Sequence, residues 1–317
     1  MRLVTRSDFD GLVCAVLLKQ VEEITDIKFV HPKDLQDGKF EVTDKDILTN
    51  VPYVPGCALW FDHHSSEVKR VTPTHDFNGV CRVAPSAARV VYDYFGGKAT
   101  FGDIDEMMRN VDKADSAQFD SDDILHPTGW VLLSFIMDAR TGLGRYHDYR
   151  ISNYQLMFEL IDACRDHTID EILDLPDVQQ RIVRYNEQEI EFKRTVRERT
   201  TTYGNVIVTD MRDVNPIPCG NRFIVYALWP KQNTSIWIVN GFRNQNCVFA
   251  CGHSIINRTG RTDIGALMSE YGGGGHFAAG TCQVAHMDAS ATLNSLVARI
   301  RASEVAPRKN GPILEAA

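Results

Sequence analysis

The residues best suited to chemistry in this sequence form two polar clusters that each follow an apolar run. Asp62, His63 and His64 end the run 57–61, which predicts a buried strand. Asp8, Asp10 and Gly11 follow the shorter apolar run 3–5, a second predicted strand. Open α/β sheets place their ligands at the carboxyl ends of strands. The two clusters together therefore predict a divalent-metal site that acts on phosphate.

The donor atoms of these clusters indicate which metal the site would select. Hard divalent cations prefer oxygen ligands, and imidazole shifts the preference toward manganese, iron, cobalt or zinc. A mixture of aspartate and histidine without thiolate therefore favours Mn²⁺ over Mg²⁺. Gly11 allows the backbone to bend and to approach a ligand closely. Because an Asp-x-Asp-Gly turn also occurs as a plain helix cap, the prediction depends on both clusters occurring together.

Alternating strands and helices must position the clusters in the first part of the chain. We predict strands at 3–5, 26–31, 46–49 and 58–61, and helices at 11–21 and 86–95. This alternation predicts a mainly parallel sheet. Residues from about 103 to 180 are predicted to be largely helical. The highly charged segment 178–200 predicts a solvated helix that connects two domains, with an ordinary surface helix as the alternative.

The last third of the chain has the pattern of a second domain. We predict strands at 205–209, 223–228, 235–240, 247–251 and 281–284, with helices at 264–271 and 289–302. The predicted organisation is an N-terminal domain 1–179, a connecting helix 180–200 and a smaller C-terminal α/β domain 201–317. The tail after Ala306 is expected to be frayed.

Composition limits the partners of the protein. The 317 residues carry a net charge of −8, which argues against a general basic surface for duplex DNA. No basic, aromatic-interleaved channel for long single strands is evident. The eight cysteines include no Cys-x-x-Cys pair and are expected to be buried reduced thiols in a cytoplasmic protein. No apolar run approaches the ~18 residues of a membrane span, so no membrane association is expected. A homodimer is a reasonable prior.

The two clusters resemble motifs of the DHH phosphoesterase superfamily, and the segment 271–280 resembles its C-terminal DHHA1-type substrate-binding signature. That superfamily includes single-strand exonucleases, nano-RNases, cyclic-dinucleotide phosphodiesterases, family II pyrophosphatases and exopolyphosphatases. The resemblance spans nearly the whole chain. It implies an N-terminal, mainly parallel sheet flanked by helices, a smaller C-terminal domain, and an active site in the cleft between the two domains.

The resemblance also implies roles for individual residues. Asp8 and Asp10 match the first metal-binding motif, and His63 matches a ligand in the third. The fourth motif is an aspartate after a helix, for which Asp115 fits best and Asp112 is the competitor. In the third motif, the resemblance places His64 near the scissile phosphate and gives Asp62 the role of orienting a histidine.

Two positions depart from the superfamily pattern. Arg6 stands where many relatives have a histidine, and Asn50 stands where an aspartate normally bridges two metals. A guanidinium has no acceptor atom and cannot ligate a metal, whereas an asparagine carbonyl can. Arg6 is free to pair with Asp8 or to contact a substrate phosphate. One or two ions fit the motifs, and we favour a single ion with Arg6 supplying the charge of the other. The ligands of that single ion would be Asp10, Asn50, His63 and Asp115.

The glycine run in the C-terminal domain predicts a phosphate-binding segment. Gly272, Gly273, Gly274 and Gly275 precede His276, so several backbone N–H groups could converge on an anion. A flexible turn is the alternative. The resemblance implies that a basic residue of the upstream segment binds a terminal phosphate. The candidates are Arg258, then Arg261, with Ser254 nearby.

We therefore predict a metal-dependent phosphoesterase in which a metal-activated water attacks a short phosphodiester, such as nano-RNA or a linear dinucleotide. An exopolyphosphatase, acting on phosphoanhydrides, is an alternative that the sequence hardly separates. A third hypothesis is a non-catalytic nucleotide sensor, because Arg6 and Asn50 replace usual metal ligands.

Overall fold

The computed structural model of the protein describes residues 1–71 and 76–305, which form two compact units. The first unit comprises Met1–Gln118 and Thr128–Val183. The second comprises Phe119–Pro127 and the described residues from Arg184 onward. The tail that we expect to be frayed lies outside the described residues. The domain limits at 179 and 201 stay predictions.

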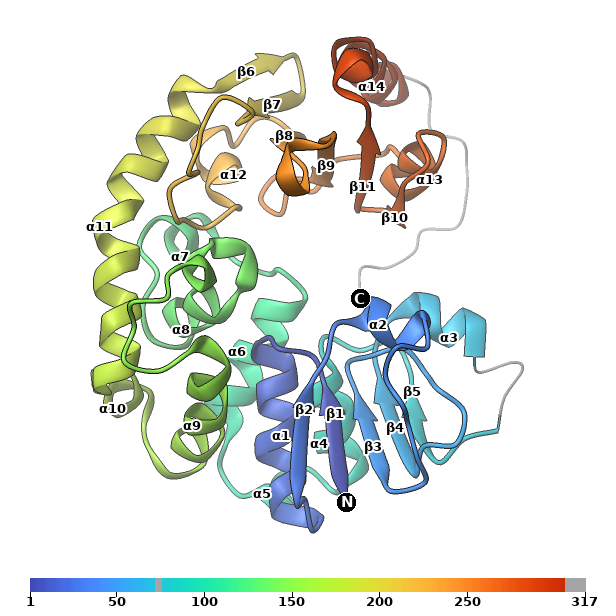
Figure 1. The fold of residues 1–317 in the computed structure, drawn as a ribbon, viewed down its shortest axis with the longest axis vertical. Helices are drawn as coiled ribbons and strands as arrows, with labels where there is room; N and C mark the ends of the chain where they lie inside the picture. Colours follow the sequence, from blue (N-terminus) through green and yellow to red (C-terminus); the bar gives the residue numbers. More distant parts are fainter. Residues whose placement is uncertain (72–75, 306–317) are drawn as a thin grey trace. The chain divides into compact units, whose positions relative to one another are not determined.

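The first unit is built on a five-stranded parallel sheet (Figure 1). The strand order is β2-β1-β3-β4-β5, so β1, β3 and β4 are adjacent in its middle. The predicted strands and the α/β class are confirmed, whereas the three-residue β5 was not predicted. The strands are β1 (Arg2–Thr5), β2 (Asp26–Phe29), β3 (Asp46–Thr49), β4 (Leu59–Asp62) and β5 (Gly79–Cys81).

Helices of the first unit flank this sheet. One of them, α1 (Phe9–Val21), lies in the core of the unit. Ten consecutive residues of α1, 9–18, are buried, because the helix is apolar on nearly every side and packs against α4, α6 and α9. The other helices are α2 (Pro32–Gln36), α3 (Ser65–Val71), α4 (Ala87–Tyr94), α5 (Lys98–Phe101), α6 (Asp105–Asp115), α8 (Gly129–Met137), η1 (Ala139–Thr141), η2 (Leu143–Arg145), α9 (Asn153–Asp166) and α10 (Ile169–Asp174).

The charged segment predicted as a helix forms α11 (Pro176–Glu198), which passes from the first unit into the second. Proline at its first position suits a helix start, where the missing N–H has no intrahelical acceptor.

The second unit is built on a six-stranded mixed sheet of order β10-β11-β9-β8-β7-β6. Only the β7–β8 pair is parallel. Its core includes Val206, Ile236, Phe249 and Ile300. The strands are β6 (Thr200–Tyr203), β7 (Val206–Asp210), β8 (Thr234–Asn240), β9 (Cys247–His253), β10 (Gly274–His276) and β11 (Ala279–Val284). The helices are α7 (Ser121–Leu125), α12 (Ile224–Leu228), η3 (Phe242–Asn244), α13 (Ile264–Ser269), η4 (His286–Asp288) and α14 (Ala289–Val305).

One predicted strand is wrong. Residues 223–228 form the short helix α12 instead of a strand, and Ile224, Val225 and Tyr226 are buried on it. A short apolar run has the same composition in a buried helix and in a buried strand, so its periodicity cannot distinguish them. The Tyr226 hydroxyl reaches Ser235 of β8 at 2.8 Å, which fastens the helix to the sheet.

All eight cysteines lie in the described part of the chain and are free thiols, six of them buried. The redox state of the thiols stays a prediction, and Cys57 and Cys81 are only partly buried, whereas we expected buried thiols. No helix within residues 1–71 and 76–305 combines the length and apolar character needed to cross a bilayer.

Candidate metal centre

Three adjacent parallel strands deliver the predicted site residues to one edge of the first sheet. The C-terminal residues of β1, β3 and β4 are paired in register. Asp8, Asn50 and His63 follow those strand ends along the chain. The Asn50 side chain donates a hydrogen bond from Nδ2 to Oδ1 of Asp8 at 3.0 Å. The structure thus brings the separate motifs together.

Asp10, His63 and Asp115 form a compact cluster of potential ligands. His63 Nε2 lies 3.0 Å from Asp115 Oδ2 and 3.8 Å from Asp10 Oδ2. One donor atom from each residue lies within 4.8 Å of the other two. This spacing is close to that of ligands that share an ion.

The N-terminus of α4 holds the Asp10 carboxylate. Its two oxygens accept hydrogen bonds from Ala87 N at 2.9 Å and Ala88 N at 2.8 Å. These amides begin a helix, where N–H groups lack intrahelical acceptors and carry partial positive charge. Burial raises the pKa of Asp10 to about 6; the neighbouring His63 and the two amides oppose this rise, and the charge of Asp8 adds to it. A buried carboxylate of this kind is suited to a cation that restores its charged form.

The structure distinguishes the two candidates for the fourth motif. Asp112 accepts hydrogen bonds from Ser86 Oγ at 2.7 Å and from Arg89 Nη2 at 2.6 Å, so it is already neutralised. Asp115, at the end of α6, faces His63 instead. Desolvation of its carboxyl group, with the charges of Asp10 and Asp8, raises the pKa of Asp115, although the residue as a whole is exposed. The geometry therefore favours Asp115 as the ligand and gives Asp112 a supporting contact.

Two buried donor atoms that follow the ends of β3 and β4 fit a metal ion. Among the described residues, no hydrogen bond is formed by Asn50 Oδ1 or His63 Nε2, and the polar atoms that lie near His63 Nε2 are the carboxylate oxygens of Asp115 and Asp10. His63 Nδ1 lies 3.1 Å from the Ala84 carbonyl oxygen, so Nδ1 carries the proton and Nε2 keeps its lone pair. Buried polar atoms are seldom left unsatisfied in folded proteins. Carboxylate, amide and imidazole donors on one small surface fit a divalent cation such as Mn²⁺.

Asp8 has a different environment from Asp10, although both belong to the same motif. Its Oδ1 accepts hydrogen bonds from Gly11 N and Asn50 Nδ2, both at 3.0 Å, and caps α1. Its Oδ2 lies 3.0 Å from Arg6 Nε in an ion pair. A Cβ atom on Gly11 would lie 2.0 Å from the Arg6 carbonyl oxygen, so the glycine permits close packing of the turn itself. We expected Gly11 to allow approach to a ligand, and its closest neighbour is the backbone.

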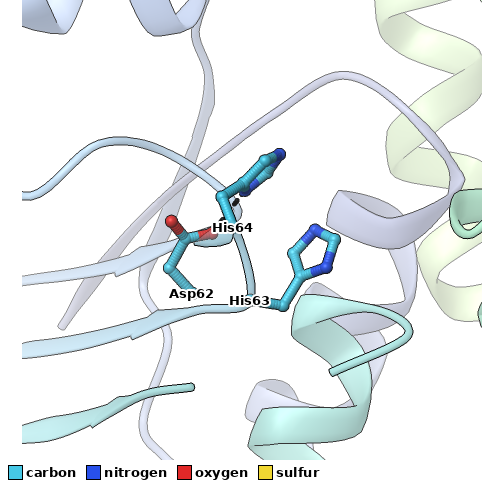
Figure 2. A group of neighbouring side chains, drawn as sticks. All are labelled: Asp62, His63 and His64. Carbon is cyan, nitrogen blue, oxygen red and sulfur yellow. Dashed lines mark hydrogen bonds and ion pairs between the residues drawn. The ribbon is translucent and has the colours of Figure 1, made fainter. Parts of the chain in front are cut away.

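His64 and Asp62 form a second pair at the end of β4. Figure 2 shows His64 turned back toward Asp62, whereas His63 points away from that carboxylate. His64 Nδ1 lies 2.8 Å from Asp62 Oδ1. Burial lowers the pKa of His64, but the hydrogen bond and the charge of Asp62 outweigh it and raise the pKa. Asp62, His63 and His64 also lie close enough to hold an ion, but the Asp62–His64 hydrogen bond already occupies donor atoms of both residues.

The predicted phosphate-binding segments lie at one edge of the sheet in the second unit. Gly274–His276 form the edge strand β10, and His276 is exposed. The amides of Gly272 and Gly273 donate to carbonyls of α13, so these two N–H groups are not free for an anion as the predicted nest requires. A Cβ on Gly273 would lie 2.0 Å from the Thr281 carbonyl oxygen, so close packing requires glycine there.

The segment carrying Ser254, Arg258 and Arg261 follows β9, two strands away from β10. Ser254 is buried, and its Oγ accepts hydrogen bonds from the amides of Ile256 and Asn257. Its hydroxyl therefore shapes the loop that carries the two arginines. Their roles, and those of His276 and the glycines, stay predictions.

Several groups that organise the centre were not predicted from the sequence. They are the amides of Ala87 and Ala88, the carbonyl of Ala84, and the pair of Ser86 and Arg89 with Asp112. The available signal was Pro85-Ser86, which correctly predicted a helix start but not the partner of its free amides.

Comparison with known proteins places the chain in a family. No protein-family model and no curated protein matches the sequence. A solved structure titled as the pGpG-specific phosphodiesterase PggH from Vibrio cholerae shares 53% identity, with a TM-score of 0.83. The match covers 95% of this chain and 99% of that one. The chain belongs to the DHH phosphoesterase superfamily.

Two solved structures with much lower identity share the fold. An exopolyphosphatase-related protein from Bacteroides fragilis has 13% identity and a TM-score of 0.53, with 96% of this chain and 93% of that chain covered. RecJ from Thermus thermophilus, solved in complex with Mn²⁺, has 12% identity and a TM-score of 0.50, with 95% of this chain and 52% of that chain covered. The predicted family is confirmed, and so is the predicted enzyme class, a phosphoric ester hydrolase.

Proposed function

We propose that this protein is a metal-dependent phosphodiesterase that hydrolyses short linear dinucleotides, with pGpG as its preferred substrate. The carrying observation is the convergence of Asp10, His63 and Asp115 beside two unsatisfied buried donor atoms. The choice of pGpG is supported by 53% identity, over nearly the full length, to a pGpG-specific phosphodiesterase.

The metal in this proposal is Mn²⁺, held by Asp10, Asn50, His63 and Asp115. Oxygen ligands with one imidazole favour this ion over Mg²⁺. Such an ion, when bound, supplies Lewis acidity to water and to a phosphoryl oxygen. The chain contributes the orientation of the ligands, because α4 fixes Asp10 and the Ala84 carbonyl fixes the His63 tautomer.

His64 is the proposed acid of the reaction. Its Nδ1–H is held by Asp62, so Nε2 remains to face substrate. The pKa of His64 is raised, since Asp62 more than offsets burial, and the charged imidazolium is therefore favoured. It can stabilise negative charge on the phosphoryl group or give a proton to the leaving oxygen.

The second unit would bind the substrate's terminal phosphate through Arg258, with Arg261 and His276 as further candidates. Guanidinium groups match phosphate geometry bidentately. Support comes from the loop itself: Ser254 anchors its start, and the His253 amide donates to the Ala278 carbonyl beside β10.

A substrate panel with Mn²⁺ tests this proposal. We expect the protein to hydrolyse pGpG, with slower turnover of pApA and of 3′,5′-bisphosphate nucleotide and none of polyphosphate. Preferred hydrolysis of polyphosphate would replace the proposal with an exopolyphosphatase. Binding of pGpG without turnover of any compound would instead support a nucleotide sensor.

A further inference from the structure

A positively charged side chain, Arg6, lies two residues before the first aspartate of the metal-binding motif. Arg6 Nε forms an ion pair with Asp8 Oδ2 at 3.0 Å, and Asp8 Oδ1 already accepts two hydrogen bonds. The Asp8 carboxylate thus has a positively charged partner and two N–H donors. An ion that approached Asp8 would have to displace Arg6 first, because guanidinium and metal would compete for the same oxygen.

Asn50 also favours a centre in which Asp8 does not bind a metal ion. Its Nδ2 donates to Asp8, which fixes the orientation of the amide and leaves Oδ1 as its ligand atom. A carboxylate at this position could bridge two ions through its negatively charged oxygens, whereas Asn50 offers one neutral oxygen and bridges poorly. Asn50 also adopts a positive φ of 54°, an uncommon conformation for a residue other than glycine. This backbone conformation accompanies the hydrogen bond that holds the Asn50 side chain against Asp8.

Charge balance separates the site into two parts. Asp10 and Asp115 supply two negative charges with the neutral donors His63 and Asn50, which suits one divalent cation. Asp8 supplies one negative charge, which Arg6 neutralises. No carboxylate of the first motif remains for a second ion.

We propose that this centre binds a single divalent cation and that Arg6 supplies, as a fixed part of the chain, the positive charge of a second. Among the described residues, the ion pair with Asp8 uses Nε, and 39% of the Arg6 side chain is exposed. The Nη groups therefore remain available to a phosphate oxygen of the substrate. The contact between Arg6 and substrate rests on the proposed function, whereas the number of bound ions does not.

Metal counting without substrate tests the stoichiometry separately from activity. Isothermal titration calorimetry of the full chain with Mn²⁺ is expected to give one equivalent. The electron paramagnetic resonance spectrum of the loaded protein should be the six-line pattern of an isolated Mn²⁺. Two equivalents of similar affinity, with an exchange-coupled spectrum, would overturn the inference whether or not pGpG is hydrolysed.

Restoring ligands at both positions provides the converse test. The variant Arg6→His with Asn50→Asp is expected to bind a second Mn²⁺ and to acquire the coupled spectrum. A folded double variant that still binds one equivalent would contradict our assignment of these two residues as the reason for the single ion. Thermal melting checks that the variant is folded. The result of the wild-type titration does not depend on this variant.

Steady-state kinetics of Arg6 variants test whether the positive charge of Arg6 contacts the substrate. Arg6→Gln is expected to keep one Mn²⁺ but to lower kcat/KM for pGpG about 10–100-fold, and Arg6→Lys should recover part of the loss. Unchanged kinetics in Arg6→Gln would refute the contact with substrate. Failure of the wild type to hydrolyse pGpG would refute the proposed function and leave the metal count as an independent result.

Discussion

Asp8 and Asp10 lie two residues apart in one motif, yet their surroundings differ in kind. Asp8 is partly exposed, caps α1 and is paired with Arg6. Asp10 is buried, is held by two helix amides and faces His63. The comparison teaches that two carboxylates of one motif can differ in whether a charged partner already occupies them, and in our proposal only Asp10 is a metal ligand. Neighbouring residues, more than the motif itself, decide which carboxylate is available to a metal.

The largest effect is expected from Asp10→Asn. The substitution removes a charged oxygen from the Asp10–His63–Asp115 cluster, so Mn²⁺ affinity should fall by more than about 100-fold, the upper range for lost outer-sphere partners. Hydrolysis of pGpG should be abolished. Calorimetry with Mn²⁺ measures the affinity.

Asp8→Asn is the matched control for this comparison. It removes the same charge two residues earlier and retains an oxygen for the Gly11 amide. We expect Mn²⁺ stoichiometry of one and an affinity close to that of the wild type. An equal loss of Mn²⁺ in both variants would show that the two carboxylates act alike, against our account.

His64→Gln is expected to separate catalysis from metal binding. Because His64 pairs with Asp62 and not with the Asp10 cluster, Mn²⁺ affinity should be unchanged. Turnover should fall by about 10²–10⁴-fold, the usual contribution of a general acid. Steady-state kinetics at saturating Mn²⁺ give the rate. Weakened Mn²⁺ binding would make His64 a ligand and contradict its assignment as the acid.

A smaller effect is expected from Arg89, which acts on Asp10 only through the start of helix α4. Arg89 and Ser86 bind Asp112, and Ser86 caps the helix whose amides hold Asp10. Arg89→Met should therefore weaken Mn²⁺ binding by about 10–100-fold, as loss of outer-sphere partners does.

Arg82→Met provides the control for that variant. Arg82 also pairs with a residue of α4, Asp93, but both side chains are largely exposed and lie away from the helix start. Mn²⁺ affinity should be unaffected. Equal weakening in both arginine variants would assign the effect to α4 stability in general.

The smallest effect on the centre is expected from Asp46→Asn, at the opposite end of β3 from Asn50. Burial would raise the pKa of Asp46, but hydrogen bonds from Arg2 and Thr43 lower it below its usual value. The charged form thus contributes stability above the ordinary pKa, and that stability is lost as pH falls through the lowered pKa. The variant should lose about 1–3 kcal/mol of unfolding free energy near neutral pH.

Urea unfolding at several pH values measures this loss, which should shrink as the solution is acidified. Mn²⁺ affinity should stay unchanged. A weaker Mn²⁺ affinity would show that the far end of the strand also positions the metal ligands.

The sequence predicted the parallel sheet and the convergence of its motifs because each motif directly follows an apolar strand. It left Asp112 and Asp115 open, since the choice depends on Arg89, which belongs to another helix. The amides that hold Asp10 come from residues 77 and 78 positions away in the chain, and local patterns carry no information on such contacts. The strand predicted at 223–228 was wrong because a short apolar run fits either type of element.

Anomalous diffraction from crystals of the full chain grown with Mn²⁺ tests the central claim most directly. The account predicts one manganese peak, contacted by Asp10, Asn50, His63 and Asp115, with Arg6 still paired to Asp8. A second manganese peak of comparable height against Asp8, or a first peak remote from His63, would contradict it.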